Sequence, residues 1–143
     1  LVNVAEFVKS VVEKYKGEAS FKVELEELYV EANEALKSAI ENVVNNAIIH
    51  GQVSPLEITI RVFKEGNDCV VRIADNGVGI PDELKEVVFE SGYSRKGGGL
   101  GLFLVRKIVE MFKGSVRLYD NKPRGVVFEI RLPMKSDNNI NAP

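Results

Sequence analysis

Hydrophobic residues recur at two periods along this chain, and these periods predict its helices and strands. Apolar side chains spaced three and four residues apart predict helices over 3–15, 33–50 and 101–112. Residues 56–63 alternate between apolar and polar and predict a half-buried strand. A turn at Gly66-Asn67-Asp68 leads to a second strand over 69–74, and the two strands should form an antiparallel hairpin. Weaker patterns predict edge strands at 21–25 and 28–30, a short helix at 84–89, and strands at 116–118 and 126–132. This order predicts a two-layer α/β sandwich, in which helices cover one face of a mixed, mostly antiparallel sheet.

Length and composition restrict the class of protein. A chain of 143 residues suits one domain, which we expect over 1–133 with a frayed polar tail over 134–143. A net charge of -2 does not suggest a nucleic-acid partner, and no apolar run reaches the ~18 residues of a membrane span. The single cysteine, Cys69, is expected in the core and fits a reducing compartment. The chain opens on Leu1 without a methionine or signal peptide, so we interpret it as one domain of a longer protein.

Three asparagines interrupt the helix predicted over 33–50. Asparagine is a poor residue inside a helix, because its side chain competes for backbone hydrogen bonds. Asn42, Asn46 and His50 are spaced four residues apart and therefore share one stripe beside the apolar face. Amide oxygens are ligands that suit magnesium. Taken alone, the pattern also fits a solvated polar face.

A second motif, Asp75-Asn76-Gly77-Val78-Gly79-Ile80-Pro81, follows the strand at 69–74. We expect Asp75 to end this strand, with Val71 and Ile73 on the strand's other face, and its carboxylate could accept a hydrogen bond from the exocyclic amine of adenine. Gly77 and Gly79 allow a sharp turn and a close approach of the backbone to a flat ring. An Asn-Gly pair is also a common turn, but a turn does not need the second glycine.

A third motif lies between the predicted helices. Residues 91–101 hold five glycines and two cations, Arg95 and Lys96. The helix that follows presents free N–H groups and a positive dipole end, which together suit a phosphate. The spacing matches neither a P-loop nor a Rossmann motif. A flexible linker is the alternative.

These three motifs, in this order, resemble the catalytic ATP-binding domain of sensor histidine kinases, within the superfamily shared with gyrase B, Hsp90 and MutL. The resemblance covers roughly 3–133 and is carried by Glu41-Asn42-Val43-Val44-Asn45-Asn46-Ala47, by 75–81, by Phe89-Glu90 and by 97–102. It implies the Bergerat sandwich fold, with ATP and Mg2+ as cofactors.

The resemblance also implies a role for each matching residue. Asn46 and Asn42 resemble the magnesium-holding pair, Asp75 the adenine-binding carboxylate, and Lys96 a lid residue that meets the γ-phosphate. The full nucleotide-binding set that we predict is Asn42, Asn46, His50, Asp75, Gly77, Gly79, Ile80, Tyr93, Arg95, Lys96, Gly97, Gly98, Gly99, Leu100, Gly101 and Leu102. Ile49 stands where many members of the family have a lysine, and Gly92 where many have a phenylalanine.

One position separates a kinase from a hydrolase. In the hydrolysing relatives a glutamate four residues before the magnesium-binding asparagine activates water, whereas this chain has Asn42 there, and an amide accepts no proton. Glu41 lies one residue off, ~100° around the helix, and should point elsewhere. We therefore expect slow hydrolysis and transfer of the γ-phosphate to another nucleophile. His50 is the only histidine, and the sequence around it does not resemble the phospho-acceptor motif of histidine kinases, so we expect no catalytic residue in this chain. His50 either lines the nucleotide pocket or is a partly exposed histidine at a helix end.

The resemblance thus predicts the catalytic domain of a protein-histidine kinase in a two-component system. It would be monomeric alone and cytoplasmic, in a parent that can be membrane-anchored. Its partners would be a dimerisation domain that carries the acceptor histidine, and a response regulator. The alternatives are a serine kinase of the anti-sigma-factor type and an ATP-gated switch without catalysis.

Overall fold

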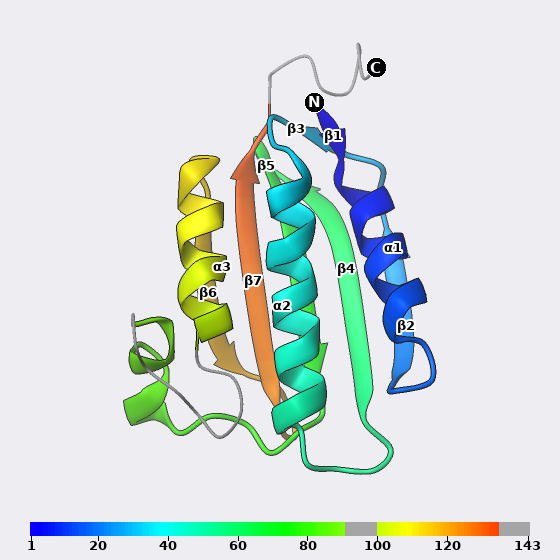
Figure 1. The fold of residues 1–143 in the computed structure, drawn as a ribbon, viewed down its shortest axis with the longest axis vertical. Helices are drawn as coiled ribbons and strands as arrows, with labels where there is room; N and C mark the ends of the chain where they lie inside the picture. The colour runs from blue at the N-terminus through cyan, green and yellow to red at the C-terminus, as the bar shows by residue number, and fades with distance from the viewer. Residues whose placement is uncertain (91–99, 135–143) are drawn as a thin grey trace.

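The computed structural model describes residues 1–90 and 100–134. A five-stranded sheet has the order β2-β4-β5-β7-β6, and three helices lie against one of its faces (Figure 1). The strands are β2 (Ser20–Leu25), β4 (Glu57–Glu65), β5 (Asp68–Asp75), β6 (Ser115–Asp120) and β7 (Val126–Pro133). β2 runs parallel to β4 and every other neighbouring pair is antiparallel, so the mixed two-layer sandwich is confirmed.

α1 and α2 each begin directly after an asparagine that caps the helix. In α1 (Val4–Tyr15) the Asn3 side chain accepts a hydrogen bond from the Ala5 N–H, at 3.1 Å. In α2 (Glu34–His50) the Asn33 side chain accepts one from the Ala35 N–H, at 2.9 Å. Both are N-caps that satisfy a free donor of the first turn. The third helix, α3 (Leu100–Met111), follows the glycine-rich segment.

The core lies between the helices and the sheet. The inward residues of β4, Ile58, Ile60 and Val62, are at most 2% exposed and belong to one apolar cluster with the buried stripe of α2. Cys69 is also fully buried, and burial raises the pKa of its thiol to about 12. The thiol is therefore protonated and inert at neutral pH.

Two short segments differ from expectation. The helix predicted over 84–89 is instead two 3-10 turns, Asp82–Leu84 and Val87–Phe89. Six residues are too few to propagate an α-helix, and the two turns bring Val88 and Phe89 into the core instead. The strand predicted at 28–30 is confirmed as β3 (Tyr29–Val30), but it pairs with β1 (Val2–Asn3) in a separate two-stranded sheet.

The chain leaves the sheet at Met134, whose N–H donates to the Asn67 carbonyl at 2.8 Å. Residues 135–143, most of the predicted tail, lie outside the described residues. Within the described ranges, no helix combines the length and apolar character that a bilayer crossing needs.

Candidate functional site

The ends of three elements meet at one end of the sandwich. α2 ends at His50, β5 ends at Asp75 and α3 begins at Leu100, and all three ends lie in the lower half of the view in Figure 1. The asparagine motif, the aspartate–glycine motif and the start of α3 are therefore brought together.

Asp75 is held on the helix-covered face of the sheet. It is 7% exposed, and its Oδ1 accepts hydrogen bonds from the N–H of Gly77 at 2.8 Å and of Val126 at 3.2 Å. The strand register pairs Ile73 with Ile60 and Asp75 with Ile58, so Asp75 shares a face with Ile73. The expectation that Val71 and Ile73 lie on the other face was wrong, because residues two apart in a strand point to the same side.

The glycines of this motif allow a close approach between loop and helix. A Cβ atom on Gly77 would lie 2.8 Å from the Gly51 Cα and 3.1 Å from the Asp75 Oδ1. The next residue, Val78, donates its N–H to the Gly51 carbonyl at 3.0 Å. Gly79 has a φ of +85°, which a residue with a side chain rarely adopts. The loop after β5 is thereby fastened to the C-terminal end of α2.

A small cavity lies between α2, this loop and the sheet. Its volume is about 10 Å³, which holds about one water molecule. It is lined by Asn46, Ala47, His50, Gly51, Asp75, Val78, Gly79, Ile80, Val126 and Phe128. We call it the base cavity. Five of the predicted site residues line it, and His50 is one of them.

The remaining predicted residues lie around the base cavity or outside the described ranges. A Cβ atom on Gly101 would lie 3.8 Å from the Asn42 side chain, so the first turn of α3 approaches Asn42. Leu102 is 2% exposed and forms part of the core. Tyr93, Arg95, Lys96, Gly97, Gly98 and Gly99 lie outside the described residues, as does the side chain of Leu100.

Glu41 points away from the site, as expected. Its Oε2 accepts hydrogen bonds from the ammonium of Lys14 and from the hydroxyl of Tyr15, both on α1. The carboxylate closest in sequence to the two asparagines therefore joins α1 to α2.

The loop between β6 and β7 braces Asp75 and was not predicted as part of the site. The Asn121 side chain donates to the Asp75 backbone carbonyl at 2.7 Å, and the Asn121 N–H donates to the Gly125 carbonyl at 3.0 Å. A Cβ atom on Gly125 would lie only 1.9 Å from the Asp75 carbonyl oxygen. The sequence of this loop indicates a turn, and only the pairing of β5 with β7 shows where the turn lies.

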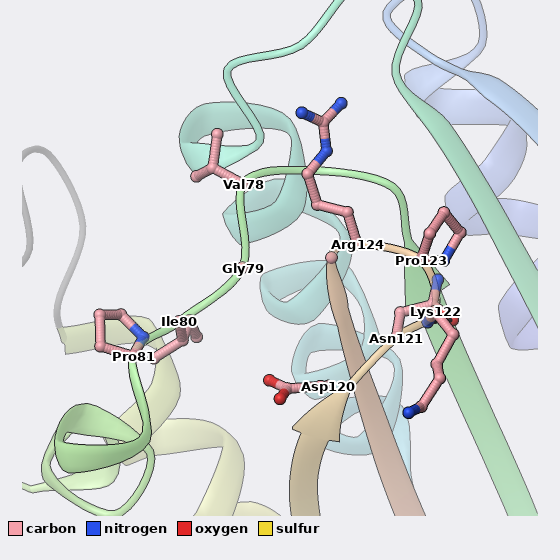
Figure 2. A pocket seen from close by; sticks show the side chains of 10 residues that line it. Val78, Gly79, Ile80, Pro81, Asp120, Asn121, Lys122, Pro123 and Arg124 are labelled. Carbon is pink, nitrogen blue, oxygen red and sulfur yellow. Dashed lines mark hydrogen bonds between the residues drawn. The ribbon is translucent and has the colours of Figure 1, made fainter.

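A larger hollow lies on the other side of segment 78–81. It has a volume of about 420 Å³, and its second wall is loop 120–125 (Figure 2). We call it the outer hollow. The base cavity and the outer hollow share Val78, Gly79 and Ile80, so one stretch of backbone separates them.

Comparisons with known proteins agree with this arrangement. A family model described as "Histidine kinase-, DNA gyrase B-, and HSP90-like ATPase" matches residues 31–136. The sensor protein CiaH of Streptococcus pneumoniae is 32% identical over 109 residues, which are 71% of this chain and 24% of CiaH. The chain thus spans about a quarter of the length of that relative.

Solved structures show the same fold over nearly the whole chain. The catalytic domain of histidine kinase ThkA, in a nucleotide-free form, has a TM-score of 0.83 and 31% identity, and the match covers 92% of this chain and 94% of that domain. Histidine kinase ThkA in complex with the response regulator protein TrrA has a TM-score of 0.78 and 30% identity, covering 94% of this chain and 41% of that one. This chain belongs to the family of histidine kinase-, DNA gyrase B- and HSP90-like ATPases, and within it to the catalytic domains of sensor histidine kinases.

Proposed function

We propose that this domain binds Mg-ATP and delivers the γ-phosphate to a histidine on another domain of its parent protein. The observation that carries the proposal is the position of Asp75, a nearly buried carboxylate at the wall of the base cavity. Two backbone N–H groups fix its Oδ1, and a carboxylate can accept about four hydrogen bonds. It therefore has acceptor capacity for the exocyclic amine of adenine.

Binding of a purine requires the walls of the base cavity to separate. The cavity of about 10 Å³ is far smaller than a nucleobase. Segment 78–81 has the outer hollow behind it, so this wall has room to move outward. Adenine would then lie against Asp75 with Gly77 and Gly79 alongside, where the missing side chains permit close contact.

Magnesium is proposed to lie at the half-buried amides of α2. Asn42 and Asn46 are one helical turn apart, and Asn46 also lines the base cavity. Their amide oxygens would supply one side of the coordination shell, and the phosphates with water would supply the rest. ATP affinity that does not change when magnesium is chelated would contradict this assignment. We propose that Arg95, Lys96 and glycines 97–99 contact the phosphates.

The site favours transfer of phosphate to a protein over transfer to water. Asn42 occupies the position where a general base would stand, and Glu41 is engaged with α1. Phosphoryl transfer to another nucleophile needs mainly positioning and neutralisation of charge, which the proposed magnesium and cations supply. A response regulator would take the phosphate next, and the solved complex of ThkA with TrrA supports such a partner. We place the domain in the cytoplasm.

The chemistry of the phosphorylated product tests this function. The full-length protein is incubated with Mg-ATP labelled at the γ-phosphate. We expect an acid-labile phosphohistidine on the parent protein. An acid-stable phosphoserine on a partner would instead identify a kinase of the anti-sigma-factor type, and nucleotide binding without any transfer would identify a switch.

Replacement of Asp75 with asparagine tests the proposed adenine contact. The asparagine oxygen can still accept from Gly77 and Val126, which places the amide N–H₂ where the second carboxylate oxygen was. The adenine amine would then meet a donor instead of an acceptor. We expect the affinity for Mg-ATP, measured by calorimetry, to fall at least tenfold, or ~1.4 kcal/mol.

The matched control is Asp68→Asn at the opposite end of the same strand, where the side chain is 41% exposed. This variant should bind Mg-ATP as the parent does. Equal affinities for the Asp75 variant and the parent would remove Asp75 from the adenine role.

A further inference from the structure

Packing holds only part of segment 78–81. Its inner side faces the base cavity and its outer side faces the outer hollow of about 420 Å³ (Figure 2). Val78 is 46% exposed, whereas Ile80 is 5% exposed. The position of this wall must therefore depend on polar contacts as well as on packing.

Lys85 supplies such contacts. Its ammonium donates to the Ile80 carbonyl at 2.8 Å, and it forms ion pairs with Asp82 and, at 2.9 Å, with Asp120. These three acceptors match the three donors of an ammonium group. The Lys85 side chain is only 17% exposed, and the hydrogen bonds that its ammonium donates to both carboxylates raise its pKa, so it is charged at neutral pH.

Two of the three acceptors belong to opposite walls of the outer hollow. Ile80 lies on segment 78–81, and Asp120 begins loop 120–125 at the end of β6. Figure 2 shows the Asp120 carboxylate directed toward the side of Ile80 and Pro81. Lys85 thus links the wall of the base cavity to the loop that also braces Asp75 through Asn121.

We propose that Lys85 is a positioning residue for nucleotide binding, which acts by tethering Ile80 to Asp120 and so keeps segment 78–81 drawn away from α2. This inference rests on the proposed function, in which adenine occupies the base cavity. Lys85 does not line the base cavity and acts only through Ile80.

The direction of the effect follows from the nature of the contact. A flexible lysine resists separation of the two groups that it joins, but it does not resist their approach. The link therefore opposes movement of segment 78–81 toward α2, and it permits the retreat into the outer hollow that admission of a purine requires. Without the link, segment 78–81 can close further onto α2, and it must be ordered again when adenine enters. Both effects cost free energy on binding and therefore weaken the affinity for ATP.

The test is Lys85→Met, which keeps the length of the side chain and removes its donors. We expect the affinity for Mg-ATP to fall roughly threefold to tenfold, the range for the loss of one ordinary hydrogen bond. Lys85→Arg keeps the charge and should recover most of the affinity. Lys37→Met is the control variant. Lys37 forms an ion pair with Glu34, three residues earlier on α2, just as Lys85 does with Asp82. This variant should bind Mg-ATP as the parent does.

Binding of inorganic tripolyphosphate separates positioning of the base from general damage. This ligand has no base, so its affinity should be equal in the parent and in Lys85→Met, whereas a loosened fold would weaken both ligands. Unchanged ATP affinity, or an equal loss for ATP and tripolyphosphate, would overturn the proposal. Asp75→Asn is measured in parallel. If Asp75→Asn binds ATP as the parent does, the proposed adenine contact is wrong. If Asp75→Asn loses affinity but Lys85→Met binds ATP as the parent does, only the proposed role of Lys85 is wrong.

Discussion

Replacement of Gly125 with alanine is expected to lower the affinity for Mg-ATP by more than tenfold and to destabilise the fold by about 3 kcal/mol. Gly125 has a φ of +112°, and an alanine Cβ atom would lie 1.9 Å from the Asp75 carbonyl oxygen and 2.9 Å from its Oδ1. No rotamer change relieves this overlap, because the closest atom belongs to the backbone. The chain must move at the point where Asp75 is held, so stability and nucleotide binding should fall together.

Gly17→Ala is the matched control for this prediction. Gly17 has a φ of +96°, and an added Cβ atom would have no heavy atom within 4 Å. This variant carries a comparable backbone strain without the collision and lies outside the site. Urea denaturation should show a smaller loss, about 1 kcal/mol, and calorimetry should show ATP affinity like that of the parent. Normal ATP binding by the Gly125 variant would contradict the proposed bracing of Asp75.

Local patterns were sufficient to predict most of the fold. The period of the apolar stripe placed α1 and α2 to within one residue. Patterns of this kind reflect interactions within a few residues, and those interactions are visible in the sequence. The 3-10 turns at 82–89 were missed because their form depends on burial of Val88 and Phe89 in the core.

The site was predictable only where its residues lie in motifs. Asn46, Asp75 and Gly79 stand in recognisable patterns, and the structure places all three around one cavity. Asn121 acts on the carbonyl of a residue 46 positions earlier, which no local pattern can show. Lys85 is similar, because its contact with Asp120, 35 positions later, exists only once the chain has folded.

The open face of the sheet carries the second large expected effect. Glu129 of β7 is 1% exposed although it lies opposite the helices. Its Oε2 accepts hydrogen bonds from Arg72 at 2.8 and 3.1 Å and from the Tyr119 hydroxyl at 3.1 Å, and its Oε1 accepts one from Arg117 at 3.1 Å. Arg131 donates to the same Oε1 at 3.3 Å. One carboxylate therefore joins side chains of β5, β6 and β7.

Glu129→Gln is expected to lower the free energy of unfolding by about 2–3 kcal/mol at neutral pH. Removal of one partner of a buried ion pair costs more than this, but Arg72 is 31% exposed and retains part of its hydration. Glu24→Gln is the control, since Glu24 pairs with Arg61 on the same face at 63% exposure and should cost under about 1 kcal/mol. Both variants should bind Mg-ATP normally, because the site lies on the helix-covered face.

The loss should depend on pH in a direction that the contacts of Glu129 fix. Burial alone would raise the pKa of Glu129, but the hydrogen bonds from Arg72 and Tyr119 outweigh it and hold the pKa below the ordinary value of 4.5. A carboxyl with a lowered pKa in the folded state stabilises the fold above its unfolded pKa and loses this contribution as the pH falls through the folded value. The difference in unfolding free energy between the parent and Glu129→Gln should therefore be constant near neutrality and shrink below about pH 4.5. A difference that stays constant in acid would show that Glu129 stabilises the sheet by packing, and not through its charge.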